Sequence, residues 1–265
     1  MRISLNTSKW YDNVWAAFVF FTRLPLWRIY QPPKESYKTV VEHWPLTGWL
    51  TGAVMAATLY FGSMVFPFEI AVVMAMAVRI LLTGALHEDG LCDFFDGFGG
   101  GGTDRERVLA IMKDSRIGTY GVLGIILYEL FVFLCLTSLS PTLAALTVLA
   151  ADPYAKMLAG QMIMTMPYAR TEAESKAKTV YRKMPLSASV SLAVQGLLPL
   201  GLYLWFVMPH GWQTVVFAPC FAMYLIYLLI WRRLRGYTGD CCGAMFLLVE
   251  LSVYLAVVYA STNQQ

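Results

Sequence analysis

Seven long apolar segments constrain this chain more than any other feature of its sequence. Each is long enough to cross the roughly 30 Å hydrocarbon core of a membrane. With 58% hydrophobic and 14% charged residues, against about 25% charged residues in soluble domains, the composition supports the same interpretation. The sequence therefore predicts an all-α fold, a polytopic integral membrane helical bundle with about seven transmembrane helices. The segments cover residues 45–62, 70–86, 118–138, 143–165, 187–207, 214–231 and 244–262.

The chain outside these segments gives no sign of a second domain. An apolar run at residues 15–21 is too short to span, so it predicts an N-terminal helix lying in the membrane interface. No repeat at a fixed period and no Pro/Ser-rich linker divides the chain. The five cysteines do not show the spacing of a zinc site or a disulfide framework. We expect residues 1–265 to form a single membrane-embedded domain without a cleavable signal peptide.

The basic residues lie in alternate loops. Of the 20 Lys and Arg residues, all except Arg79 and Lys156 fall in the N-terminal segment or in the loops at 87–117, 166–186 and 232–243. The positive-inside rule assigns that face to the cytoplasm. We therefore expect the N-terminus inside and the C-terminus outside.

The loop after the second apolar segment carries the acidic motif HEDGLCDFFDG, residues 87–97. If the helix of the second apolar segment runs on through this motif, Asp89, Asp93 and Asp96 fall at positions i, i+4 and i+7, and at about 100° per residue they share one face. Carboxylate oxygens suit a hard cation such as Mg²⁺, which in turn suits a phosphate-bearing substrate. A solvated acidic helix end is the alternative, although such ends seldom show this spacing. Gly90 allows a ligand or a neighbouring helix to approach the backbone closely.

The next stretch reads FGGGGTDRERVLAIMKDSRIGTYG. Its glycine run could cradle phosphate oxygens, but it lacks the lysine-serine ending of a P-loop. Asp104 is a good N-cap for a short helix. Arg105 and Arg107 are interpreted as solvated or as contacts to lipid headgroups, whereas the charged residues at 113–116 lie where the chain re-enters the membrane.

Together these two stretches resemble the signature of the adenosylcobinamide-GDP ribazoletransferase, or cobalamin synthase, family. The family pattern H-x-D-G-x-x-D-x-x-D-G is met from His87 to Gly97, although the pair Phe94–Phe95 stands where smaller residues are expected. Similarity to the family covers nearly the whole chain in the expected order. Further matching stretches are FFTRLP at 20–25, HWPLTGWLTG at 43–52, MTMPYAR at 164–170 and GYTGDCCGA at 236–244.

The resemblance implies a specific reaction. Such enzymes join α-ribazole, or its 5′-phosphate, to adenosylcobinamide-GDP, giving adenosylcobalamin (or its 5′-phosphate) and GMP, and they depend on Mg²⁺. This phosphoryl transfer needs charge neutralisation on a pyrophosphate, an in-line nucleophile and a stabilised leaving group. The whole chain would be one catalytic domain in the bacterial cytoplasmic (inner) membrane, with its active site on the cytoplasmic face. Its partners would be the corrinoid nucleotide, the ribazole substrate and membrane lipids, with no nucleic acid; homo-oligomer formation stays open.

The predicted catalytic residues are His87, Asp89 and Asp93, and the predicted Mg²⁺ ligands are Asp89, Asp93 and Asp96. His87 is a candidate general base toward the ribazole hydroxyl because imidazole titrates near neutrality. The alternative is that it orients an aspartate. The predicted substrate-binding residues are Arg23, Lys113, Asp114, Arg116, Arg170, Tyr237, Thr238 and Asp240.

The GYTGD loop brings several of these candidates together. Tyr237 is expected to stack on a base or a corrin edge, and Thr238 to bond phosphate. Asp240 is expected either to complete the metal shell or to bind a guanine edge. A purely structural turn is the alternative for the loop as a whole.

Ionisable residues within the apolar segments need partners. Asp152 and Lys156, at i and i+4, are predicted to pair with each other. Arg79, Glu129 and Glu250 have no partner evident from the sequence, so they are interpreted as a buried network or as the lining of a corrinoid pocket.

Two other function classes fit this sequence less well. A CDP-alcohol phosphotransferase would require Ala-Arg where this chain has Asp93–Phe94. A transporter should place its key acids near the bilayer midplane, whereas the strongest acidic cluster here lies at a membrane surface.

Overall fold

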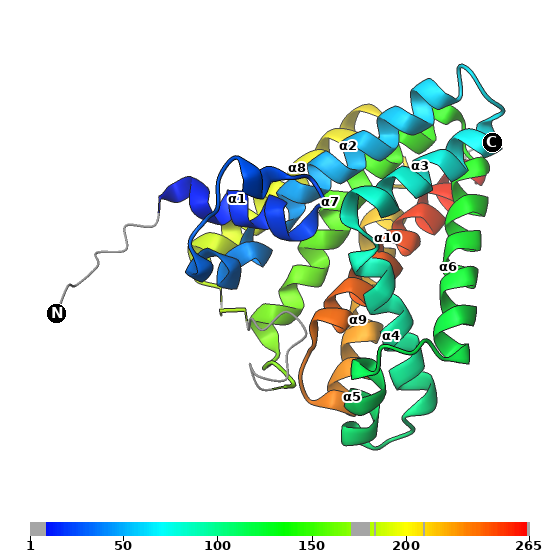
Figure 1. Cartoon of the computed structure of the whole chain (residues 1–265). Helices are drawn as coiled ribbons and strands as arrows, with labels where there is room; N and C mark the ends of the chain where they lie inside the picture. The colour runs from blue at the N-terminus through cyan, green and yellow to red at the C-terminus, as the bar shows by residue number, and fades with distance from the viewer. Residues whose placement is uncertain (1–8, 171–180, 183, 209, 264–265) are drawn as a thin grey trace.

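The described part of the protein is almost entirely helical. The structure, a computed structural model, describes residues 9–170, 181–182, 184–208 and 210–263. Its helices form a bundle in which α10 lies among the others (Figure 1). The α-helices are α1 (Trp10–Phe21), α2 (Trp44–Gly62), α3 (Phe68–Thr83), α4 (Leu86–Gly100), α5 (Arg105–Lys113), α6 (Thr119–Thr137), α7 (Pro141–Thr165), α8 (Leu186–Phe206), α9 (Trp212–Leu234) and α10 (Gly239–Thr262). Two 3-10 helices, η1 (Leu26–Arg28) and η2 (Lys34–His43), lie between α1 and α2.

Every apolar segment predicted from the sequence forms a helix, namely α2, α3 and α6 to α10. By length and composition, four of the described helices, α6, α8, α9 and α10, are suited to crossing a membrane, or five if the bent pair α3–α4 is one span. The expected number of about seven spans is therefore not confirmed. Helices α2 and α7 carry buried polar side chains, including Thr51 on α2 and Asp152 on α7.

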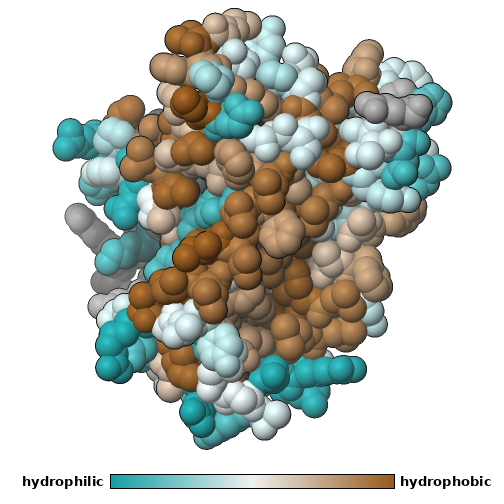
Figure 2. Space-filling model, turned by 90° about the vertical axis from the view of Figure 1, so that its right-hand side faces the viewer, coloured by the Kyte–Doolittle hydropathy of each residue, from teal (hydrophilic) through white to brown (hydrophobic). Residues whose placement is uncertain are grey.

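The surface is that of a membrane protein. Large apolar side chains point outward along α6, α8 and α9, among them Ile126, Val194 and Phe221. Figure 2 shows hydrophobic side chains gathered across the middle of one face, with hydrophilic side chains mainly around its rim. Continuous apolar surface on this scale is typical of contact with lipid.

A sharp bend separates α3 from the acidic motif. Helix α3 ends at Gly84 (φ 67°), which is followed by Ala85 (φ 56°), and α4 then leaves at 91° to α3. Two consecutive left-handed residues end a helix, and such a conformation is easy for glycine but uncommon for alanine. The helix of the second apolar segment thus does not continue into the motif. A new helix begins at Leu86 and carries the motif instead.

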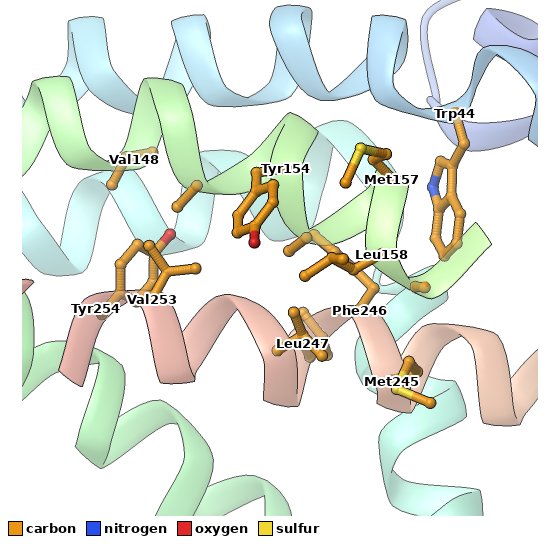
Figure 3. Close-up of a cluster of buried hydrophobic side chains, with 14 of the residues drawn as sticks. Trp44, Val148, Tyr154, Met157, Leu158, Met245, Phe246, Leu247, Val253 and Tyr254 are labelled. Atoms are coloured by element: carbon orange, nitrogen blue, oxygen red, sulfur yellow. The ribbon is translucent and has the colours of Figure 1, made fainter. Parts of the chain in front are cut away.

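Helix α10 forms the centre of the core. Most of it is buried, and it packs against α7 through Tyr154, Leu158, Phe246 and Leu247, as Figure 3 shows. Its first turn carries Asp240 and lies beside α4. The core therefore fixes the position of α10 relative to the acidic motif.

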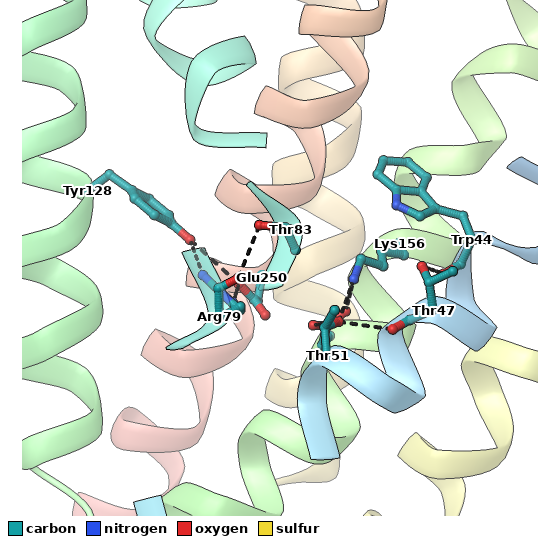
Figure 4. A network of polar contacts seen from close by, with 9 residues as sticks. Trp44, Thr47, Thr51, Arg79, Thr83, Tyr128, Lys156 and Glu250 are labelled. Atoms are coloured by element: carbon teal, nitrogen blue, oxygen red, sulfur yellow. Dashed lines mark hydrogen bonds and ion pairs between the residues drawn. The ribbon is translucent and has the colours of Figure 1, made fainter. Parts of the chain in front are cut away.

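Two buried charge pairs hold the middle of the bundle (Figure 4). Lys156 Nζ lies 2.5 Å from Asp152 Oδ1, which confirms the pairing predicted from their spacing. Thr51 donates to Asp152 Oδ2 at 2.6 Å and accepts from Lys156 at 2.8 Å. In the second pair, Arg79 on α3 lies 2.6 Å from Glu250 on α10. These partners lie in different helices, so the ion pair connects α3 to α10.

The N-terminal segment packs onto η2 through α1. Asp12, which could pass for a surface acid in the sequence, is buried and accepts hydrogen bonds from the Tyr30 hydroxyl (2.6 Å) and the Lys9 backbone (2.7 Å). The hydrogen bond to Asp12 raises the pKa of Tyr30 to about 12. Helix α1 is thereby fixed to the segment that leads into α2.

Candidate active site

Two glycines allow α4 and α10 to cross in close contact. A Cβ atom at Gly90 would lie 3.1 Å from the Cα atom and carbonyl oxygen of Asp240, and one at Gly243 would lie 3.2 Å from the carbonyl oxygen of His87. These distances are shorter than ordinary van der Waals contact, so a side chain at either position would force the two helices slightly apart. Gly90 therefore makes room for the backbone of α10. The crossing places the start of the acidic motif beside the first turn of that helix.

A cavity of about 320 Å³ opens beside this crossing. It is bounded by α1, η2, the starts of α2, α4 and α10, and the segment that carries Arg170. One part is aromatic and apolar, while the other carries charged side chains. The lining residues are Phe20, Phe21, Val41, Trp44, Leu86, His87, Asp89, Tyr168, Arg170, Tyr181, Gly239, Asp240, Cys242 and Gly243.

His87 lies between the two parts of the cavity wall. Its ring is 3% exposed and stacks on Trp44 (centroids 5.7 Å apart) and Phe21 (6.2 Å), while Phe246 meets it edge-on at 4.8 Å. Its Nε2 atom is buried and has no hydrogen-bond partner among the described residues. Contacts with three aromatic rings therefore help to hold the ring, and no aspartate of the described residues is bonded to Nε2.

The first two aspartates of the motif lie on the part of α4 nearest the cavity. Asp89 is exposed and lines the cavity, and Asp93 follows one helical turn later with a half-buried side chain. Each of the two side chains also has an interaction with another group. Their i, i+4 spacing on one helix, predicted from the sequence, places the two carboxylates on a common face.

Asp96 has a different environment. Its side chain is buried, and its two oxygens accept the backbone N–H groups of Gly118 (2.7 Å) and Gly121 (2.8 Å). A Cβ atom at either glycine would lie 2.5 Å from an Asp96 oxygen. Asp96 thus caps the start of α6. Within the described residues, no three His, Cys, Asp or Glu side chains gather closely enough to hold a metal ion, so the structure does not assemble the predicted three-aspartate set.

The predicted residues Arg170 and Asp240 meet at the charged part of the cavity. The Arg170 side chain is 5% exposed, and its Nη1 atom lies 3.9 Å from Asp240 Oδ2. Its Nη2 atom donates to the carbonyl oxygen of Leu109 on α5 at 2.9 Å. The segment after α7 and the first turn of α10, which are far apart in sequence, thus place a cation and an acid side by side.

Backbone pairing joins these two parts of the chain. Ala169 N donates to Tyr237 O at 2.8 Å, and Tyr237 N donates to Pro167 O at 3.0 Å, which forms an isolated parallel bridge. Arg105 reinforces it by donating to the carbonyl oxygens of Ala169 (2.7 Å) and Leu234 (2.8 Å). Arg105 is exposed, as its interpretation as a solvated residue expects, but it also connects α5, α9 and the loop that carries Arg170.

The GYTGD loop is largely structural. Tyr237 is 2% exposed, packs against Tyr168 and does not line the cavity, so Tyr168 rather than Tyr237 is placed to meet a ligand. Thr238 is fully buried and caps α10 by accepting from Cys241 N at 3.2 Å. Of the three residues predicted here, only Asp240 lines the cavity.

Four other predicted substrate-binding residues lie outside the cavity lining. Arg23 packs over Gly84, and its backbone N–H donates to Leu82 O at 2.7 Å. Lys113 is exposed at the end of α5. Asp114 and Arg116 form an exposed ion pair of 2.6 Å, and this hydrogen bonding lowers the pKa of Asp114 to about 2. The structure does not bring these four residues to the cavity.

The aromatic wall is the part of the site that the sequence analysis did not assign. Phe20, Phe21, Trp44 and Tyr181 come from three separate stretches. A signal was available, because FFTRLP and HWPLTGWLTG both belong to the family-like stretches. Their aromatic residues could not be separated from ordinary interfacial ones without the fold.

An apolar helical bundle whose cavity combines aromatic rings, a histidine, carboxylates and a buried arginine has the features of a membrane-embedded enzyme. The comparisons with known proteins identify the family. A family model described as cobalamin-5-phosphate synthase matches residues 13–258. The chain therefore belongs to the cobalamin-5-phosphate synthase, or adenosylcobinamide-GDP ribazoletransferase, family.

Curated relatives extend this similarity over almost the whole chain. A protein of Leptospira interrogans named adenosylcobinamide-GDP ribazoletransferase is 33% identical over 250 residues, covering 91% of this chain and 93% of the relative. Proteins of the same name from Ralstonia pickettii and Vibrio parahaemolyticus are 36% and 37% identical, covering 92% and 91% of this chain and 93% and 90% of the relatives. No solved structure matches the chain.

Proposed function

We propose that this protein transfers the cobinamide phosphoryl group of adenosylcobinamide-GDP to α-ribazole or its 5′-phosphate, giving adenosylcobalamin (or its 5′-phosphate) and GMP. The observation that carries the proposal is the match to relatives of that name over about nine-tenths of both chains. The cavity supports it, because a histidine, acidic groups and a buried arginine meet there. These are the groups that phosphoryl transfer uses.

In the proposed reaction, a ribose hydroxyl of the ribazole attacks the phosphorus that is bonded to cobinamide. An O–P bond forms, the bond between that phosphorus and the bridging oxygen breaks, and GMP leaves with the bonding electrons. The hydroxyl proton passes to His87, whose Nε2 atom has no competing partner among the described residues. Arg170, which lines the same cavity, provides positive charge to the pyrophosphate.

Mg²⁺ fits the carboxylates on α4. Asp89 and Asp240 line the same cavity as Arg170, so an anionic pyrophosphate would meet more negative than positive charge there. A divalent cation would reverse that balance. Protein sites commonly bind Mg²⁺ through one or two carboxylates together with substrate phosphates. We propose that Asp89 and Asp93 hold the ion, which would neutralise charge on the pyrophosphate, and that Asp96 instead fixes α6.

We also propose that the protein lies in the bacterial cytoplasmic membrane with this cavity open to the cytoplasm. The one-sided distribution of Lys and Arg supports this orientation. The transporter alternative gains no support, because Asp152 pairs with Lys156 and Glu250 pairs with Arg79 inside the bundle.

The test uses the full-length protein purified in detergent or liposomes. It is incubated with adenosylcobinamide-GDP, α-ribazole and Mg²⁺, and GMP and adenosylcobalamin are quantified together. We expect equal amounts of both products, and neither product when α-ribazole is omitted. GMP release without cobalamin would indicate a hydrolase and would contradict the proposal.

A further inference from the structure

The cavity beside α4 has a charged end and an aromatic end. Asp89, Arg170 and Asp240 form its charged end. Its other end is built from aromatic rings: Phe21 stacks on Trp44 at 5.2 Å with 14° between the planes, and Phe20 meets both Phe21 (4.9 Å) and Tyr181 (6.4 Å) edge-on. The ring of His87 lies nearly parallel to both Phe21 and Trp44, with its centroid 6.2 and 5.7 Å from theirs.

The aromatic end suits a planar molecule. Aromatic rings bind planar π-systems by stacking or edge-on contact, and nucleoside bases are bound in this way. The wall offers few polar atoms, since Phe20, Phe21 and Val41 have none in their side chains. The Trp44 indole N–H is buried and has no partner among the described residues. A ligand with several polar edge atoms would leave them unpaired here, at a substantial cost in free energy.

Size restricts the ligand further. At about 320 Å³, the cavity lies near the lower limit of pockets that hold small organic ligands, roughly 300–1,000 Å³. A nucleoside fits such a volume. A corrin macrocycle with its amide side chains and upper ligand is much larger, so the corrinoid must lie outside this cavity.

We infer that the aromatic end is the subsite for the base of the nucleoside acceptor, where Phe20 and Tyr181, its half-buried rings, contact a planar base with a mostly apolar edge. Phe21 and Trp44 are buried and stack on each other, and Phe21 supports Phe20 edge-on. This inference rests on the proposed function. Of the two bases in that reaction, the benzimidazole of α-ribazole has a single free ring nitrogen, whereas guanine has polar atoms along most of its edge. The benzimidazole matches the wall. Its ribose then lies toward His87, Asp89 and Arg170, where the phosphoryl transfer is proposed to occur.

Phe20→Leu tests this subsite. Phe20 is half-buried at the cavity wall, so leucine keeps an apolar side chain while removing the ring. We expect the KM for α-ribazole to rise roughly 5- to 20-fold, the usual range for loss of one aromatic contact to a base, with the KM for adenosylcobinamide-GDP unchanged. Phe61→Leu, an exposed phenyl near the end of α2 and not in the cavity, is the matched control and should leave both values unchanged.

A binding measurement decides the question without turnover. Equilibrium dialysis of labelled α-ribazole against the wild-type protein, without corrinoid, should show binding that Phe20→Leu weakens and that GMP does not displace. Absence of binding, displacement by GMP, an unchanged KM for α-ribazole, or a raised KM for adenosylcobinamide-GDP alone would each overturn the inference. Failure of the proposed function is a separate result, because it requires that the wild type makes no cobalamin.

Discussion

The carboxylate of Asp96 on α4 accepts the backbone N–H of Gly118 at 2.7 Å, 22 residues further along the chain. With the second bond to Gly121, it fixes the start of α6 to the acidic motif. The three aspartates of the motif therefore have two kinds of environment. Asp89 lines the cavity, whereas Asp96 holds two helices together.

Asparagine substitutions should separate these two roles. Asp89→Asn and Asp93→Asn remove charge at nearly constant size, so we expect the Mg²⁺ concentration for half-maximal activity to rise or turnover to be lost, with normal thermal stability. Asp96→Asn should lower the melting temperature, because the amide has only one acceptor oxygen for two N–H donors. Mg²⁺ titration of activity checks the first expectation, and thermal unfolding checks the second. Glu106→Gln, an exposed acid in the first turn of α5, is the control. Wild-type Mg²⁺ dependence in both Asp89→Asn and Asp93→Asn would contradict the metal assignment.

His87→Phe should distinguish a proton acceptor from a packing residue. Phenylalanine keeps the aromatic contacts with Phe21, Trp44 and Phe246 but has no nitrogen. We expect kcat to fall by roughly 10²- to 10⁴-fold, the usual contribution of a general base, with little change in thermal stability. A loss below about tenfold would leave His87 with a packing role only.

Arg105→Gln should impair the reaction indirectly. The substitution removes hydrogen bonds to Ala169 and Leu234 and so loosens the loop that carries Arg170. Hydrogen bonds from charged groups contribute about 1.5–3 kcal/mol each, so we expect kcat/KM for adenosylcobinamide-GDP to fall by tenfold or more. Steady-state kinetics checks this, with the exposed Arg107→Gln as the matched control. Equal activity of the two variants would show that the hydrogen bonds of Arg105 do not position Arg170.

Lys156→Met should destabilise the protein by roughly 3–5 kcal/mol, because it leaves Asp152 as an uncompensated buried charge. Adding Asp152→Asn should recover much of that loss, since the double variant has no buried charge at this pair. Thermal unfolding in detergent measures both. If the double variant is no more stable than the single one, the ion pair is not what the substitution disrupts.

Topology gives a further prediction from the sequence. The distribution of Lys and Arg places the loop between α2 and α3, and the end of α10, outside the cytoplasm. An alkaline phosphatase reporter fused after α10 should be active, and one inserted between α5 and α6 should be inactive. The opposite pattern at α10 would mean that the number of crossings differs by one.

Sequence patterns predicted the features that depend on residues close together in the chain. The apolar segments became helices, and Asp152 paired with Lys156 one turn away. Contacts between distant parts of the chain were not predictable from such patterns. Examples are the hydrogen bond that Gly118 N–H donates to Asp96 and the ion pair between Arg79 and Glu250, which are 171 residues apart. The bend after α3 was also missed, because Ala85 gives no signal for a left-handed conformation.

The glycine contact between α4 and α10 makes the width of the reaction centre depend on single methyl groups. A Cβ atom at Gly90 would lie 3.1 Å from the backbone of Asp240, which would have to move by a few tenths of an ångström to make room for it. A methyl group at this position would push the acidic helix and the first turn of α10 apart, and with them the carboxylates of Asp89 and Asp240. The spacing between the two carboxylates therefore depends on the absence of a side chain, at a residue that touches neither substrate in the proposed arrangement.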